Sequence, residues 1–138
     1  MEYFDEAGII RADLLDKDAY EQANRFVVRF NKKHNKNEVD TRKSLSYAQL
    51  RKFFNEFRQL EKKVNTEGFN KVKPLIKMVK SKASYAANPN NPKIPIQFKE
   101  FLIDNVNRIN EEKDFEAFML HFEAVVGFFY GIEGIKNN

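Results

Sequence analysis

The stretch LSYAQLRKFFNEFRQLEKKV, residues 45–64, decides the fold of this chain. Ser46 and Gln49 have the spacing of a capping box, in which each side chain bonds a free backbone N–H group at a helix start. Leu45 and Leu50 have the spacing of a hydrophobic staple around the same start. Apolar residues then recur every three or four positions, on one face of a helix. They are Tyr47, Leu50, Phe53, Phe54, Phe57, Leu60 and Val64. The sequence predicts a helix with an apolar face for a core and a basic face opposite it.

Four further segments have helical apolar spacing, and no segment alternates at period two long enough to predict a strand. Asp18 with Glu21 is a second candidate capping box, and Asp114 is the expected cap of the last helix. Pro74 either starts or kinks the helix of residues 69–87. The expected inward side chains of the first helix are Tyr20, Ala23, Phe26, Val27 and Phe30. We predict an all-α fold, a single-domain bundle of about five helices.

The whole chain, residues 1–138, is expected to form one helical domain, since its length suits a single core. Fourteen Phe and a hydrophobic content of 42% provide the apolar surface for that core. Three segments are predicted to lie outside the helices. They are a loosely docked acidic arm at 1–15, a basic loop at 31–44, and a loop rich in proline and asparagine at 88–95.

The composition excludes several kinds of site. The chain has no cysteine, so it forms no disulfide, thiolate metal site or cysteine nucleophile. Its longest apolar run, residues 124–132, is shorter than the roughly 20 residues that span a bilayer. The first residues are acidic, which does not fit a signal peptide. We expect a soluble, cytoplasmic protein with no cofactor and no membrane contact.

Basic charge is concentrated in the middle of the chain, although the net charge is only +4. Residues 1–23 hold two Lys/Arg against seven Asp/Glu, residues 24–82 hold seventeen against five, and residues 83–138 hold five against eight. Such clustering is typical of nucleic-acid binders, while a solvated lysine-rich surface is the alternative interpretation. The candidate RNA-binding residues are Arg42, Lys43, Arg51, Lys52, Arg58, Lys77, Lys80, Lys82 and Tyr85.

These cations are expected to form one continuous groove wall. Arg42 and Lys43 precede the central helix, whose N-terminal dipole also favours phosphate. Few aromatic residues are interleaved with the cations, which favours contacts to the RNA backbone over reading of bases. Tyr85 is the candidate stacking residue, with packing at the helix end as the alternative. Lys113 and Lys136 lie outside the basic region of the sequence.

Catalytic patterns are scarce. His34 and His121 have no partners at metal-ligand spacing, and His121 is expected to be a half-buried structural histidine. Arg29 and His34 fit the Arg-x4–6-His pattern of HEPN ribonucleases, in which this pair assists RNA cleavage. That family usually has a polar residue after the arginine, and here it is Phe30. A HEPN-type ribonuclease is thus one alternative function, and a protein-interaction module whose basic face meets an acidic partner is another.

Several segments resemble, in order, motifs of the small subunit of type III-A CRISPR effector complexes, the Csm complexes. Residues 45–53, LSYAQLRKF, resemble the LTxSQLRKF segment of that family, and residues 76–87, IKMVKSKASYAA, resemble its LKPKLAYAAGR segment. The helix at 98–109 and the end of the chain, DFEAF and FEAVVGFFYG within 114–131, resemble its C-terminal FxxFFEAxVAYHKYYG. The resemblance covers residues 45–131.

The resemblance implies a small all-helical subunit without an active site. Its copies stack alongside the backbone subunits that hold the guide RNA. The implied role is to line the path of the guide–target RNA duplex and to hold target RNA through its backbone. The implied partners are this RNA, other copies of the chain, and the backbone and large subunits. A homodimer of the isolated chain is a further expectation, because exposed apolar surface promotes self-association.

Some positions match the basic residues of the family and others depart from them. Arg51 and Lys52 match its Arg-Lys pair, and Lys80 and Lys82 match the cations before its tyrosine. The Gly-Arg pair that follows YAA in the family is missing here, and Lys93 is a candidate to replace the charge of that arginine. The family's C-terminal His and Lys are also missing from residues 127–131, so we expect this end to serve packing.

Overall fold

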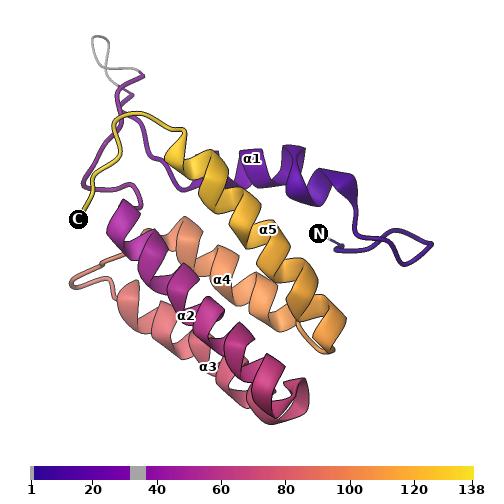
Figure 1. The fold of residues 1–138 in the computed structure, drawn as a ribbon. Helices are drawn as coiled ribbons and strands as arrows, with labels where there is room; N and C mark the ends of the chain where they lie inside the picture. Colours follow the sequence, from indigo (N-terminus) through magenta and orange to yellow (C-terminus); the bar gives the residue numbers. More distant parts are fainter. Residues whose placement is uncertain (1, 32–36) are drawn as a thin grey trace.

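The central helix begins at Ser46, and the far end of the chain helps to cap it. In the computed structural model, Ser46 is the N-cap of α2 (Tyr47–Glu67), and its Oγ accepts a hydrogen bond from the Gln49 backbone N–H at 3.2 Å. The Gln49 side chain does not complete the expected capping box, since its Oε1 has no hydrogen-bond partner among the described residues. Instead, the carbonyls of residues 136–137 accept bonds from the first two N–H groups of α2, at 2.9 and 2.8 Å. Figure 1 shows the C-terminus beside the start of this helix.

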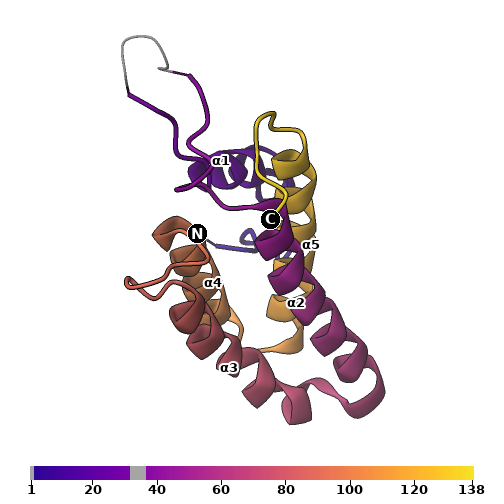
Figure 2. The ribbon, with the colours of Figure 1, turned by 90° about the vertical axis from the view of Figure 1, so that its left-hand side faces the viewer.

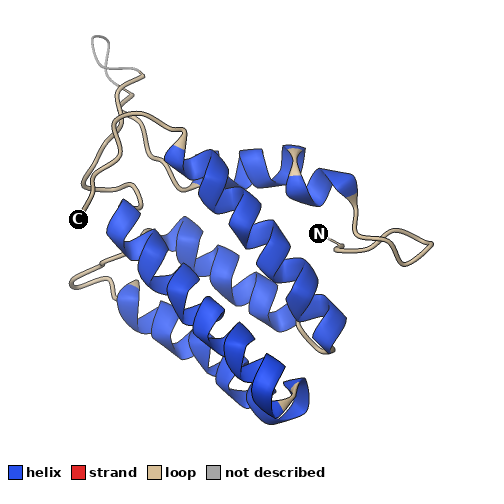
Figure 3. Cartoon of the chain, in the orientation of Figure 1, coloured by secondary structure: helices blue, strands red, loops and turns tan. Residues whose placement is uncertain are grey.

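The structure describes residues 2–31 and 37–138, so part of the predicted basic loop, residues 32–36, lies outside the described residues. The described part is helices joined by loops, and Figure 3 shows no strand in it. The helices are η1 (Ala12–Leu15, a 3-10 helix), α1 (Lys17–Arg25), α2, α3 (Phe69–Ala86), α4 (Ile96–Arg108) and α5 (Glu112–Tyr130). The prediction of an all-α single-domain bundle of about five helices is confirmed.

Helices α2 to α5 run up and down, because short connections reverse the chain after each of them. Gly68 alone joins α2 to α3, with a φ of +92°, a left-handed backbone conformation that favours glycine. α3 continues through Pro74 without a break in the helix. Figure 2 shows α3 and α4 on one side of the bundle and α2 and α5 on the other, with α1 across one end. Side chains fill the space between these two pairs of helices.

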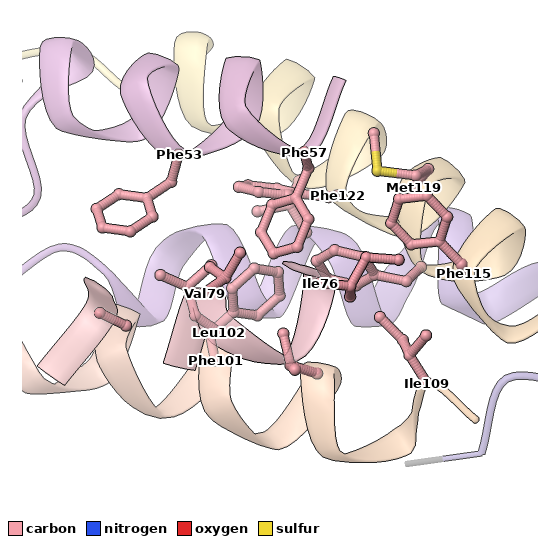
Figure 4. Packing of buried hydrophobic residues seen from close by; sticks show 14 of the residues in the cluster. Phe53, Phe57, Ile76, Val79, Phe101, Leu102, Ile109, Phe115, Met119 and Phe122 are labelled. Atoms are coloured by element: carbon pink, nitrogen blue, oxygen red, sulfur yellow. The ribbon is translucent and has the colours of Figure 1, made fainter. Parts of the chain in front are cut away.

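The interior is built largely from phenylalanine rings. Figure 4 shows Phe53 and Phe57 of α2 facing Phe101 of α4 and Phe122 of α5. Phe122 meets Phe57 and Phe101 edge to face, with ring centroids 5.9 and 5.2 Å apart, a favourable geometry for aromatic pairs. Phe122 is fully buried, as the sequence predicts for the inward face of the last helix.

Phe54 departs from the predicted apolar face of α2. Its side chain is only partly buried, because it lies at the edge of the α2–α5 contact rather than inside it. The Phe54 and Phe122 rings meet edge to face with centroids 5.2 Å apart, and the Arg58 guanidinium lies over the Phe54 ring, 4.8 Å from its centroid. The prediction that Phe54 is a core residue was therefore wrong in the extent of burial, which is partial rather than full.

The inward face of the first helix agrees with the prediction at Ala23 and Phe26, which are fully buried, but not at Tyr20. Ala19 and Ala23 are fully buried, and the exposed fraction of Tyr20 is 55%. The Tyr20 ring packs from outside onto Phe128 of α5, with centroids 5.5 Å apart. The small alanines let α1 approach α5 closely, so the large aromatic residue is displaced to the rim. α1 also begins at Lys17, and no side chain caps it, so the predicted Asp18–Glu21 capping box is absent.

The last helix begins earlier than predicted. Glu111 is the N-cap of α5, and Asp114 is three residues further on rather than at the cap itself. The Asp114 carboxylate accepts hydrogen bonds from the backbone N–H groups of Asn110 and Glu111, at 3.1 and 2.9 Å. Asp114 thus helps to cap the helix start, but from the third helical position.

The N-terminal arm is anchored rather than loosely docked. Tyr3 is buried, with 4% of its surface exposed, and Leu14 is fully buried. The Tyr3 hydroxyl donates to Asn105 Oδ1 at 2.7 Å, and the Asn105 amide donates to the Phe101 carbonyl at 2.8 Å. Burial raises the pKa of Tyr3 well above its usual value, so the hydroxyl keeps its proton and serves as a donor. The acidic composition of the arm gives no indication that Tyr3 and Leu14 are buried.

Tyr3→Phe should lower the free energy of unfolding by about 1–2 kcal/mol, because it leaves the buried Asn105 Oδ1 without its donor. The ring and its packing are kept, so the loss reports the hydrogen bond. Urea denaturation followed by circular dichroism measures it. The control is Tyr20→Phe, which removes the hydroxyl of an exposed ring and should leave stability unchanged. Equal effects of the two variants would mean that the arm is not held at Asn105.

Candidate nucleic-acid interface

The basic side chains of α2 point toward two different neighbours. Arg51 donates a hydrogen bond to the Tyr130 hydroxyl at 3.1 Å, and Arg58 forms an ion pair with Glu123 at 3.2 Å. Both partners belong to α5. Lys52 follows Arg51 by one residue, about 100° around the helix, and faces α3 instead. The predicted groove wall is therefore not continuous, because the basic residues of α2 face two different helices.

Lys77 and Lys80 are directed toward the end of α4. The Lys77 ammonium donates to the Val106 carbonyl at 2.8 Å, and the Lys80 ammonium donates to Asn107 Oδ1 at 2.8 Å. A cation at a helix C-terminus is favourable, because the last carbonyl groups carry partial negative charge. Burial, and then the neighbouring cations Lys80 and Lys73, lower the pKa of Lys77. These two lysines thus support the α3–α4 contact.

Four other predicted residues come together around one hollow between α2, α3 and the loop after α3. Lys52, Lys82, Tyr85 and Lys93 line it. Glu56 lies among them and forms an ion pair with Lys82. We call this the Tyr85 hollow. Within residues 2–31 and 37–138, Tyr85 is the most exposed of the large apolar side chains, with an exposed fraction of 80%.

Arg42 and Lys43 line a second hollow next to the same loop, and Lys93 lines it as well. The segment that carries the first two is tied down locally. The buried Asp40 carboxylate accepts from their backbone N–H groups at 3.1 and 3.3 Å, and Ser44 exchanges hydrogen bonds with the backbone of Val28. Lys93 therefore connects Lys52 and Lys82 on one side with Arg42 and Lys43 on the other.

Lys136 belongs to the same surface, contrary to the prediction that it lies outside the basic region. It lines a third hollow together with Arg42 and Lys93. The bonds from residues 136–137 to the start of α2 bring it there. No local pattern in the sequence indicates this placement. We call these residues together the basic strip: Arg42, Lys43, Lys52, Lys82, Lys93 and Lys136.

The two histidines take different places. His34, one half of the HEPN-type pattern, lies outside the described residues, while Arg29 donates to the Asn37 carbonyl at 2.6 Å. His121 is fully buried rather than half-buried, and its Nδ1 lies 2.6 Å from the Leu14 carbonyl. Because a carbonyl only accepts, Nδ1 carries the proton of the neutral ring. Burial lowers the pKa of His121.

The described residues, 2–31 and 37–138, contain neither a metal-binding cluster nor a helix that could cross a membrane. No three His, Asp or Glu side chains gather there in a way that would hold a metal ion. Among the helices of this part of the chain, none combines the length and the apolar content needed to cross a bilayer.

Comparison with known proteins identifies the family. The model of the family described as Csm2 Type III-A matches residues 18–132, which is most of the chain. No individual curated protein and no solved structure gives a significant match. The matched region contains all five α-helices except the first residue of α1, and most of the basic strip. The chain therefore belongs to the Csm2 family of type III-A CRISPR systems, the small structural subunits of the Csm effector complex.

Proposed function

We propose that this chain holds RNA by its phosphates along the basic strip, as a non-catalytic subunit that lines the path of guide and target RNA in the Csm complex. One observation carries the proposal. Lys93 lines three hollows, so the cations from the loop before α2, from α2 and from α3 form one connected surface. A connected run of cations is suited to a chain of phosphates, which is a line of negative charge.

The side chains of the strip are mostly free to exchange partners. Among the described residues, only Lys82 of the strip forms a side-chain ion pair, the one with Glu56. By contrast, Arg51, Arg58, Lys77 and Lys80 are all engaged by neighbouring helices. A free surface cation exchanges bound counterions for a phosphate at little cost, whereas an engaged cation must first break a contact. The strip, which is part of the predicted site together with Lys136, is therefore the surface that we assign to RNA.

Changing Lys52 and Lys93 together to alanine should weaken the binding of single-stranded RNA and flatten its salt dependence. Each phosphate contact contributes about −0.7 to the slope of log affinity against log salt, so two lost contacts should reduce its magnitude by about 1.4. Fluorescence anisotropy of a labelled RNA over a series of salt concentrations measures the slope. Thermal stability should stay the same, because neither side chain makes a polar contact among the described residues.

Lys71→Ala with Lys113→Ala is the matched control, since it removes two charges from outside the strip. Each of these lysines forms an exposed ion pair, at 3.6 and 3.7 Å, and Lys113 also lies over the Phe4 ring, 5.4 Å from its centroid. Such exposed contacts contribute little to stability. Affinity and slope should stay near those of the unchanged chain. If both double variants behaved alike, the strip would be ordinary solvated surface, and contact with an acidic protein would become the better explanation of its charge.

We also propose that copies of this chain contact one another, both in the complex and as a homodimer of the isolated chain. Exposed apolar side chains favour such contacts, since apolar surface is stabilised by removal from water. Ile9 is 64% exposed and Ile96 is 52% exposed, at the N-terminal arm and at the start of α4.

A further inference from the structure

Tyr85 is exposed in a way that its helix does not require. The buried stripe of α3 ends at Ala83 and Ala86, and Tyr85 lies between them on the side of Lys82. Among the described residues, its ring stacks on no other aromatic ring and its hydroxyl forms no hydrogen bond. An aromatic ring with an exposed fraction of 80% keeps a large apolar face in water. Such a ring is well suited to stacking on a ligand.

The Tyr85 hollow has the chemistry of a site for one planar polar ring. Its apolar part comes from the buried residues Phe53 and Ala86. Its volume is about 280 Å³, slightly below the range of about 300–1,000 Å³ for ligand pockets, so it suits only a small ligand. Glu56 supplies a carboxylate that only accepts hydrogen bonds, and Lys52, Lys82 and Lys93 surround the hollow with positive charge.

We propose that the Tyr85 hollow binds a single unpaired base of RNA, with the base stacked on Tyr85 and the adjoining phosphates held by the surrounding lysines. This inference rests on the proposed function and adds a base contact to it. The base must be unpaired, because bases inside a duplex are stacked on both faces and their edges are paired. The ligand is therefore a single-stranded or looped-out nucleotide rather than the duplex itself.

Glu56 gives the hollow a preference among bases. Its carboxylate accepts from an exocyclic amino group, which cytosine carries and uracil lacks. In the free protein the Lys82 ammonium is the partner of Glu56. When a base enters, its amino group replaces the ammonium at the carboxylate, and Lys82 is free to meet a phosphate. Both charged groups thus keep a partner.

The test compares the full chain with three labelled single strands of equal length at one salt concentration: oligocytidine, oligouridine, and a ribose-phosphate strand without bases. Oligocytidine should bind about tenfold more tightly than the abasic strand, within the range measured for base–aromatic stacking. Tyr85→Ala should abolish this difference and leave the binding of the abasic strand unchanged, whereas Tyr85→Phe should keep it. The control Tyr20→Ala removes another exposed ring, outside the basic strip.

The preference among bases has its own variant. Glu56→Gln keeps the shape of the side chain and adds a donor that suits uracil O4, so the preference for oligocytidine over oligouridine should be lost. The outcomes separate the two proposals. If the abasic strand and oligocytidine bind equally well and Tyr85→Ala changes neither, the base site is wrong while the phosphate role stands. If no strand binds, the abasic strand included, the phosphate role fails, and the base site fails with it.

Discussion

Phe122→Ala should lower the free energy of unfolding by about 3–5 kcal/mol, the cost of deleting a fully buried phenylalanine ring. Phe122 lies where three helices meet, in ring contact with Phe57 of α2 and Phe101 of α4. The surrounding rings are held by different helices and cannot all move into the space. A small domain has only about 5–15 kcal/mol of net stability, so this variant should be close to the limit of folding.

Phe54→Ala is the matched comparison on the same contact, because Phe54 meets Phe122 from the outer edge. Its partial burial predicts a loss of only about 1–2 kcal/mol. Urea denaturation of both variants, with the slope against denaturant held as a check on two-state unfolding, measures the two losses. If Phe54→Ala cost as much as Phe122→Ala, the edge position of Phe54 would be wrong.

The apolar spacing of the sequence predicts most of the helices, because their inward faces are made of large residues. The segments expected at 69–87 and 98–109 are observed as α3 (Phe69–Ala86) and α4 (Ile96–Arg108). The first helix is the exception. There Ala23 and Phe26 are buried as predicted, but Ala19 is buried in place of Tyr20, because the presence of α5 makes close approach of small residues better than burial of Tyr20. A rule that places the largest residues inside fails for such a contact.

The candidate site is predictable in its residue types and not in its grouping. The charges of Arg51 and Lys52 are adjacent in sequence, yet one meets α5 and the other faces α3. Lys136 joins the basic strip only because the chain returns to cap α2. The sequence shows which side chains are cations. The tertiary contacts decide which of these cations are engaged by neighbouring helices and which are free to bind phosphate.

Stability should fall as the pH drops below about 6.5, because His121 is buried as a neutral ring. Its Nδ1 proton is bonded to the Leu14 carbonyl, and its Nε2 has no hydrogen-bond partner among the described residues. A second proton would have to sit on that Nε2, away from water. Burial therefore lowers the pKa of His121. The Leu14 bond and the Asp18 carboxylate act in the opposite direction, and Arg11 acts with burial.

The sign of the effect follows from the lowered pKa. In the unfolded chain the ring takes up a proton near pH 6.5, while the folded protein resists protonation to a lower pH. Acid thus favours the unfolded state, and one such group gives a slope of at most about 1.4 kcal/mol per pH unit between pH 7 and pH 5. Carboxylates ordinarily titrate nearer pH 4, below this window.

Urea denaturation at a series of pH values measures this loss, and two variants assign it. His121→Asn keeps an N–H donor at the position of Nδ1 and removes the titrating ring, so its stability should be lower at pH 7 but flat between pH 7 and pH 5. His34→Asn removes the other histidine of the chain and should keep the slope of the unchanged protein. A slope that survives in His121→Asn, or that disappears in His34→Asn, would show that the buried ring is not the group that resists protonation.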